Sequence, residues 1–144
     1  KGYKTALESA GIKVKPEYIW NSQHTEQSAY RKIMEKGKDL DFTAICISVE
    51  EQMPGVYRAL RDLDFAVPDD VALITLGDSQ LARHLNPAMT VLDLHTEKLG
   101  YLAAKKLSNL INGQKEETRR KVQTDLIKRS SCGCKSNSEV VGQK

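Results

Sequence analysis

Cysteine, aromatic residues and long apolar runs are all scarce in this sequence. The three cysteines are an odd number and no secretory signal accompanies them, so we expect reduced thiols instead of a disulfide framework. No segment approaches the roughly 18 apolar residues of a membrane span, and residues 1–4 (KGYK) lack the apolar core of a secretory signal. These absences predict a cytoplasmic protein with no membrane partner.

Neither sign of charge dominates the composition. Lys and Arg number 22 against 19 Asp and Glu, which gives a formal net charge of +3 and argues against a protein that coats nucleic acid. The 144 residues, of which 40% are hydrophobic, supply enough apolar mass for one compact domain. Because the chain starts at Lys1 without Met and within a helical pattern, we expect it to be a piece of a longer protein.

Helical and strand patterns alternate along the chain. Residues 25–28 (TEQS) supply a helix N-cap, and Pro54 fits the first turn of a helix because it has no backbone donor. The run 42–48 is apolar throughout, which is typical of a strand buried on both faces. The predicted strands are residues 16–21, 42–48, 71–76, 89–94 and 122–127, and the predicted helices are residues 3–10, 29–37, 53–63 and 96–112.

This alternation predicts an α/β fold with a mostly parallel, doubly wound sheet that helices cover on both faces. In such sheets ligands bind outside the carboxyl ends of the strands. The loops at those ends are residues 22–24, 48–51 and 77–79. Their imidazole, carboxylate and hydroxyl groups suit a small hydroxylated ligand, and the sequence indicates His24, Glu50 and Asp78 as the site residues.

A series of short segments also follows one order that is typical of a known family. The segments are residues 43–51 (TAICISVEE), 55–60 (GVYRAL), 67–71 (VPDDV), 78–79, 81–82, 86–90 (NPAMT), 99–100 and 126–130 (LIKRS). Together they resemble the effector-binding core of lactose/galactose-repressor (LacI/GalR) type bacterial regulators, which is similar to periplasmic sugar-binding proteins.

The resemblance implies two α/β lobes that close around a small effector, a sugar or a related metabolite, and an N-terminal helix-turn-helix that reads DNA. Residues 1–131 correspond to the second lobe with its crossing segments, and residues 132–144 form a flexible tail. The first lobe and the DNA-reading segment would precede Lys1. The resemblance also implies a homodimer and no cofactor.

In the family, the predicted helix 96–112 packs on the first lobe. Its apolar face therefore needs another cover in this chain, because each Leu side chain left exposed loses about 1.5–3 kcal/mol of burial free energy. We expect it either to associate with a second copy or to fold back on its own sheet. The apolar residues of that face are Leu99, Leu102, Ala103, Leu107 and Leu110.

The chain departs from the family pattern at the predicted site. The family has Asn-Asp where this chain has Val49-Glu50, and its Gly-Phe-Asp-Asp corresponds here to residues 75–78 (TLGD), which keep only the second acid. Each site residue also has an interpretation without a ligand. Glu50 favours a helix start, Asp78 turns the chain, and His24 is an exposed loop imidazole.

Two further classes of function remain open in the sequence. The lobe could serve an output domain other than a DNA reader, and a small enzyme would need a nucleophile beside a base, for which no spacing gives support. We therefore expect no catalysis. Cys132 and Cys134 lack a second Cys/His pair for zinc, and Cys46 is expected to be a small buried hydrophobe.

Overall fold

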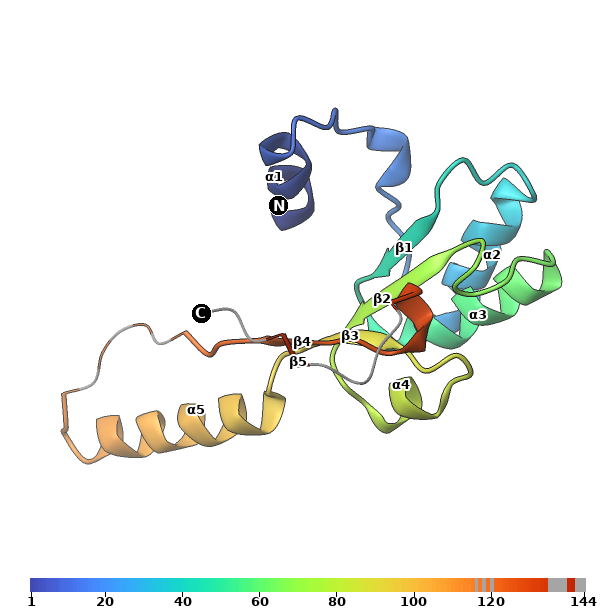
Figure 1. The fold of residues 1–144 in the computed structure, drawn as a ribbon. Coiled ribbons are helices and arrows are strands. Elements are labelled where there is room, and N and C mark those ends of the chain that lie inside the picture. The colour runs from blue at the N-terminus through green and yellow to red at the C-terminus, as the bar shows by residue number, and fades with distance from the viewer. Residues whose placement is uncertain (116, 118, 120, 135–139, 142–144) are drawn as a thin grey trace.

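A five-stranded sheet organises the chain in a computed structural model that describes residues 1–115, 117, 119, 121–134 and 140–141. The strands lie in sequence order, the first three parallel and the last two antiparallel (Figure 1). This confirms the predicted α/β class with mostly parallel strands in its main part. The strands are β1 (Ala44–Ile47), β2 (Ala72–Leu76), β3 (Thr90–Asp93), β4 (Asp125–Ile127) and β5 (Val140–Val141).

Two helices, α2 (Glu26–Lys36) and α3 (Met53–Asp62), cover one face of the sheet. The predicted cap is confirmed, because the Thr25 side chain accepts a hydrogen bond from the Ser28 amide. Pro54 lies in the first turn of α3, as expected. The core between helices and sheet is apolar and is made by Ala29, Ile33, Ile47, Met53, Val56, Ala59, Leu60, Val71, Leu73, Ala82, Met89 and Val91.

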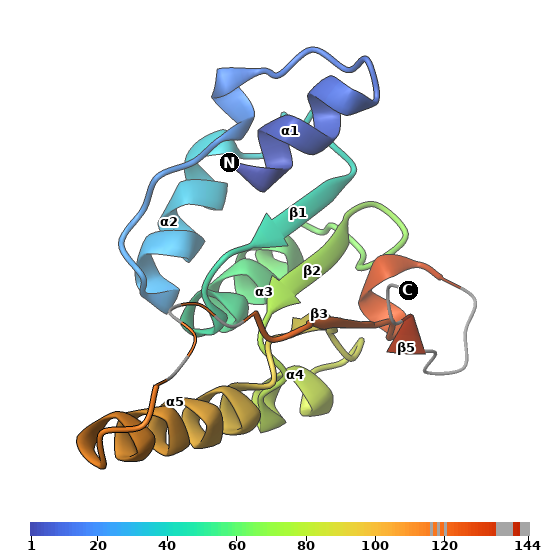
Figure 2. The same ribbon diagram turned by 90° about the vertical axis from the view of Figure 1, so that its left-hand side faces the viewer.

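The opposite face of the sheet is more open than the sequence predicts. Side chains alternate along β1 and β2, so that Leu73 is buried whereas Ala44 and Cys46 are exposed. The expectations of a strand buried on both faces and of a buried Cys46 are therefore wrong. The reason is that α2 and α3 both pack on one side, and α1 (Gly2–Ser9) and α5 (Thr96–Ile111), which stand on the other side, have no buried residue (Figure 2).

Residues 16–21 do not form the predicted strand. Pro16–Tyr18 make a 3-10 turn (η1), and the following residues run beside β1 without pairing with it. Aromatic packing explains the difference, because the rings of Tyr18 and Trp20 both contact Phe42 edge-on, at 6.1 and 5.4 Å between centroids. The Tyr18 hydroxyl also donates to the Asp41 carboxylate at 2.7 Å. Side-chain contacts thus hold this segment where backbone pairing was expected.

Helix α5 projects from the sheet as an arm, joined to it through β3 and the segment that leads back to β4. It matches the predicted helix, but it does not fold back on the sheet, so that alternative is wrong. Leu107 is 60% exposed and Leu110 51% exposed. Among the described residues, no helix is long and apolar enough to cross a membrane.

The closing segment after β4 is anchored to the sheet just before the predicted tail of residues 132–144. Ser130–Cys132 form a 3-10 turn (η3), and Ser131 is fully buried. The Ser131 hydroxyl donates to the Leu73 carbonyl at 2.7 Å and accepts from the Thr90 amide at 2.8 Å. Val140–Val141 then pair with β4 as β5, while the rest of the predicted tail after residue 134 lies outside the described residues. Cys132 and β5 lie within the predicted tail, whose flexibility stays a prediction.

Candidate functional site

Two of the three predicted site residues, Glu50 and Asp78, follow strands at the carboxyl edge of the sheet. Glu50 begins the 3-10 turn η2 (Glu50–Gln52) directly after β1, and Asp78 follows β2 and precedes α4 (Gln80–His84). The Glu50 Oε1 atom accepts a hydrogen bond from the Ser79 amide at 3.0 Å. The loops after β1 and β2 are therefore joined at this edge.

His24 lies in the loop that leads into α2, and it is exposed. That loop is fixed to the same edge through Gln52, whose side-chain amide donates to Ser22 Oγ at 2.8 Å and to the Gln23 carbonyl at 3.0 Å. The structure thus brings the loops of all three residues to one edge. Gln52 is a buried side chain that joins the two loops, and the sequence does not single it out although it lies two residues after Glu50.

Asp78 is the most enclosed of the three, with 6% of its side chain exposed. Its Oδ1 accepts from Arg129 Nη2 at 2.6 Å, and its Oδ2 accepts from Arg83 Nη2 at 2.8 Å. Desolvation alone would raise the pKa of Asp78, but the hydrogen bonds and charges of Arg83 and Arg129 outweigh it and hold the pKa below its ordinary value. Both carboxylate oxygens are thus engaged by arginines, which makes Asp78 a structural anchor of this loop.

Glu50 keeps one oxygen for another partner. Among the described residues only its Oε1 has a hydrogen-bond donor, the Ser79 amide. A Cβ at Gly77 would come within 2.7 Å of this same oxygen, so the glycine lets the carboxylate approach the loop. The second Glu50 oxygen and the exposed His24 imidazole are two of the groups that can meet a polar ligand at this edge.

Arg129 holds this edge together, and the sequence does not single it out. Besides the bond to Asp78, its Nη1 donates to the Met89 carbonyl at 2.9 Å, and only 15% of its side chain is exposed. The segment after β4, which returns from the α5 arm, is in this way joined to the loop after β2. The sequence offers only a basic residue at the end of a strand as a signal, and that pattern is common on protein surfaces.

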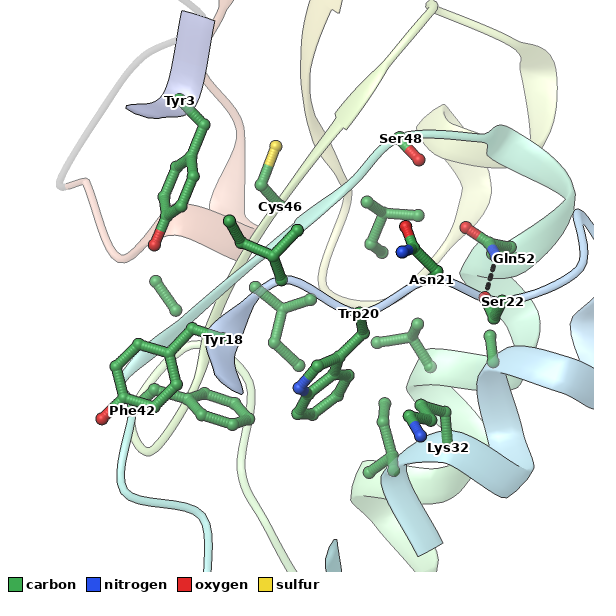
Figure 3. Close-up of a pocket in the computed structure, with 17 residues that line it drawn as sticks. Tyr3, Tyr18, Trp20, Asn21, Ser22, Lys32, Phe42, Cys46, Ser48 and Gln52 are labelled. Atoms are coloured by element: carbon green, nitrogen blue, oxygen red, sulfur yellow. Dashed lines mark hydrogen bonds between the residues drawn. The ribbon is translucent and has the colours of Figure 1, made fainter. Parts of the chain in front are cut away.

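A cavity of about 480 Å³ opens between residues 18–22 and β1 (Figure 3). Trp20 and Phe42 make part of its aromatic wall, and Ser48 and Gln52 mark its polar end, towards the carboxyl end of β1. It borders the predicted site, but none of His24, Glu50 and Asp78 lines it. Within the described ranges, no three His, Cys, Asp or Glu side chains gather closely enough to hold a metal ion.

Comparisons with known proteins agree on one family. The sequence model of the periplasmic binding protein-like domain matches residues 1–132. The chain is 29% identical to the HTH-type transcriptional regulator RegA of Clostridium saccharobutylicum over 132 residues, which are 90% of this chain and 40% of RegA. It is 31% identical to the HTH-type transcriptional regulator CelR of Thermobifida fusca, covering 91% of this chain and 39% of CelR. The chain therefore spans about two fifths of the length of these curated relatives.

Solved structures give the same result. The transcriptional regulator CelR in complex with cellobiose superposes with a TM-score of 0.82 at 30% identity, over 90% of this chain and 40% of that one. The Escherichia coli transcriptional repressor ascG superposes with a TM-score of 0.81 at 25% identity, over 90% of this chain and 48% of that one.

The fold and the polar carboxyl edge define an α/β lobe of the kind that binds small ligands. The chain belongs to the periplasmic binding protein-like domain family, and its relatives include LacI-type transcriptional regulators. The resemblance found in the sequence is thereby confirmed.

Proposed function

We propose that this chain is the effector-sensing lobe of a bacterial transcriptional regulator. It would hold a small molecule between its carboxyl edge and a second lobe, and a helix-turn-helix outside this chain would read DNA. The observation that carries the proposal is the family match over residues 1–132 together with regulators as relatives. Those relatives also make a non-catalytic role the better supported one.

The mechanism requires only that the effector binds two lobe arrangements with different affinity. A ligand shifts such an equilibrium by no more than its differential binding free energy between the two states. Glu50 and His24 supply polar groups on this lobe, and the arginine-held Asp78 keeps the loop after β2 in place. The spacing of the DNA-reading heads in a homodimer would then follow the lobe arrangement.

A sugar is the effector class that we propose. Carboxylates and imidazoles bind hydroxyl groups well, and aromatic side chains next to the edge, such as Trp20, offer flat apolar surface. The relative CelR forms a complex with cellobiose, which supports this class. The residues at positions 49–50 and 77 differ from the family pattern, so we expect a different sugar preference from that of most members.

Thermal melting of the full-length protein with a panel of sugars and nucleosides tests this function. A sugar at 100 times its dissociation constant should stabilise the protein by about 2.7 kcal/mol through mass action and should be recovered unchanged. A panel in which only nucleosides shift the melting temperature would contradict the sugar class. Turnover of the ligand would instead support an enzyme, and a full-length sequence with another output domain would overturn the DNA-binding role.

Replacing Glu50 by Gln should weaken effector binding by about 1.5–3 kcal/mol, because a hydrogen bond to a charged acceptor is worth that much. The amide oxygen of Gln can still accept from the Ser79 amide, so the fold should persist. Calorimetry on the full-length protein measures the affinity. Glu51→Gln, a change of the neighbouring exposed carboxylate, is the matched control and should leave affinity unchanged. Equal affinities for both variants would assign Glu50 to the helix start alone.

The isolated 144-residue chain should self-associate through α5. Leu99, Leu107 and Leu110 are each at least half exposed on that helix, and burying one Leu gains about 1.5–3 kcal/mol. Light scattering at increasing concentration should show a species of twice the monomer mass, and Leu107→Lys should shift it to monomer. Leu81→Lys, which changes an exposed leucine on α4, is the control. A monomer at all concentrations would refute the association.

A further inference from the structure

Two cysteines flank a glycine in the closing segment of the chain. Cys132 is the last residue of η3, Gly133 takes the left-handed backbone conformation with φ of 70°, and Cys134 follows. This turn is not part of the candidate effector site, because it packs against Pro68 and the amino-terminal half of β2 instead of the carboxyl edge. The proposed sensing function therefore leaves both thiols without a role.

The turn is held firmly in place. The Ser131 amide donates to the Ala88 carbonyl at 2.9 Å, and the buried Ser131 hydroxyl bridges Leu73 and Thr90. Cys132 is half-buried beside this anchor, and its Sγ donates to the Arg129 carbonyl at 3.4 Å. Cys134 is exposed. One thiol is thus fixed on the fold, while its neighbour is open to solvent.

The two thiols interact with each other, and the interaction makes them unequal. Desolvation alone would raise the pKa of Cys132, but the neighbouring Thr90 hydroxyl and Cys134 thiol outweigh it and lower the pKa. The hydrogen bond with Cys132 raises the pKa of Cys134. Pairs in which one thiol ionises more easily and the other is accessible are typical of reactive cysteines, whereas buried structural cysteines are inert.

We propose that Cys132 and Cys134 form a dithiol site that reduces a low-molecular-weight disulfide and closes a disulfide between them. The Cα atoms of residues 132 and 134 can be at most about 7 Å apart, and a disulfide needs about 4.4–6.8 Å between Cα atoms. The spacing is therefore compatible with a bond between the two cysteines. The flexible glycine between them allows the closure without movement of Ser131.

The chemistry proceeds by two thiol–disulfide exchanges. The Cys132 thiolate attacks one sulfur of the small disulfide, whose S–S bond breaks and releases one thiolate. Cys134 then loses its proton to solvent and attacks the Cys132 sulfur of the mixed disulfide. The second small thiolate leaves, and the Cys132–Cys134 bond forms. The protein loses two electrons and two protons, and the small disulfide becomes two thiols.

Cys46 provides an internal comparison. It lies on the wall of the cavity beside β1, where partial desolvation raises the pKa of its thiol. A lower pKa gives more thiolate but a weaker nucleophile, and the net gain in rate is about threefold per unit. Because the two pKa shifts have opposite directions, Cys132 should react faster than Cys46.

Peptide mapping after oxidation tests the proposal. The intact protein is treated with glutathione disulfide, quenched with an alkylating agent and digested with trypsin. Cleavage after Arg129 and Lys135 leaves both thiols on one short peptide, and Cys46 lies on another. We expect that peptide to lose two hydrogens and to resist alkylation, while Cys46 stays alkylated.

Single variants separate the two steps. Cys134→Ser should stop the reaction at a stable mixed disulfide between Cys132 and glutathione, and Cys132→Ser should react more slowly at Cys134. Cys46→Ser should behave as the wild type. Persistent glutathione on the wild-type peptide, or oxidation of Cys46 before Cys132, would overturn the proposal. Circular dichroism of each variant confirms that the fold is retained, because a thiol and a hydroxyl are similar in size.

Discussion

Replacing Arg129 by Met should lower the free energy of unfolding by about 3 kcal/mol, the lower end of the range for breaking a buried ion pair. The side chain of Arg129 is 15% exposed and that of Asp78 is 6% exposed, so the pair is largely shielded from water. The Met side chain fills similar space but leaves one Asp78 oxygen without its donor. The Met89 carbonyl also loses a hydrogen bond of 2.9 Å.

Arg83→Met is the matched control, because Arg83 binds the other oxygen of the same carboxylate. The Arg83 side chain is 57% exposed, so water and salt screen its charge, and its replacement should have a much smaller effect. Urea denaturation of the two variants measures the difference. Equal losses of stability would show that burial does not distinguish the two arginines.

The pH dependence of stability supplies a second measurement. The pKa of Asp78 is lower in the folded protein than its ordinary value of 3.8. Its ionised form therefore stabilises the fold above pH 3.8, and this contribution is lost as the pH falls through the folded-state pKa. Arg129→Met should raise the folded-state pKa, so the difference in stability between wild type and variant should shrink in acid.

Local signals in the sequence predict most of the elements of this fold. The cap at Thr25 and the proline at position 54 each depend on neighbours within one helical turn, and both are confirmed. The strand predicted at residues 16–21 is wrong for a different reason. Its aromatic side chains contact Phe42, more than 20 residues along the chain, and such a contact has no periodicity that a local pattern can show.

In the candidate site, too, the sequence predicts what depends on local pattern and misses what depends on distant contacts. A parallel sheet brings strand ends to one edge, so the places of Glu50 and Asp78 follow from the strand pattern. The structural role of Asp78 does not follow from that pattern, because its partner Arg129 is 51 residues away, in the segment after β4. Their assignment as effector ligands stays a prediction, and for Asp78 the two arginines favour the structural interpretation.

Replacing Gly55 by Ala should lower the free energy of unfolding by about 2 kcal/mol, although Ala is the better helix former. Gly55 lies in α3 where that helix meets α2. A Cβ here would overlap the Glu26 carbonyl oxygen and lie 3.1 Å from the Tyr30 amide nitrogen. Both are main-chain atoms within α2, so the clash cannot be relieved by a side-chain rotation and the helices must separate.

Gly100→Ala tests the same substitution where no neighbour interferes. Gly100 lies in α5, and a Cβ there would meet nothing within 4 Å. Without a clash only helix propensity acts, which favours Ala by up to about 1 kcal/mol. The two variants should therefore change stability in opposite directions, as measured by urea denaturation of each. A Gly55→Ala protein as stable as the wild type would mean that α2 and α3 lie further apart than the overlap requires, and the core between them would have to be packed differently.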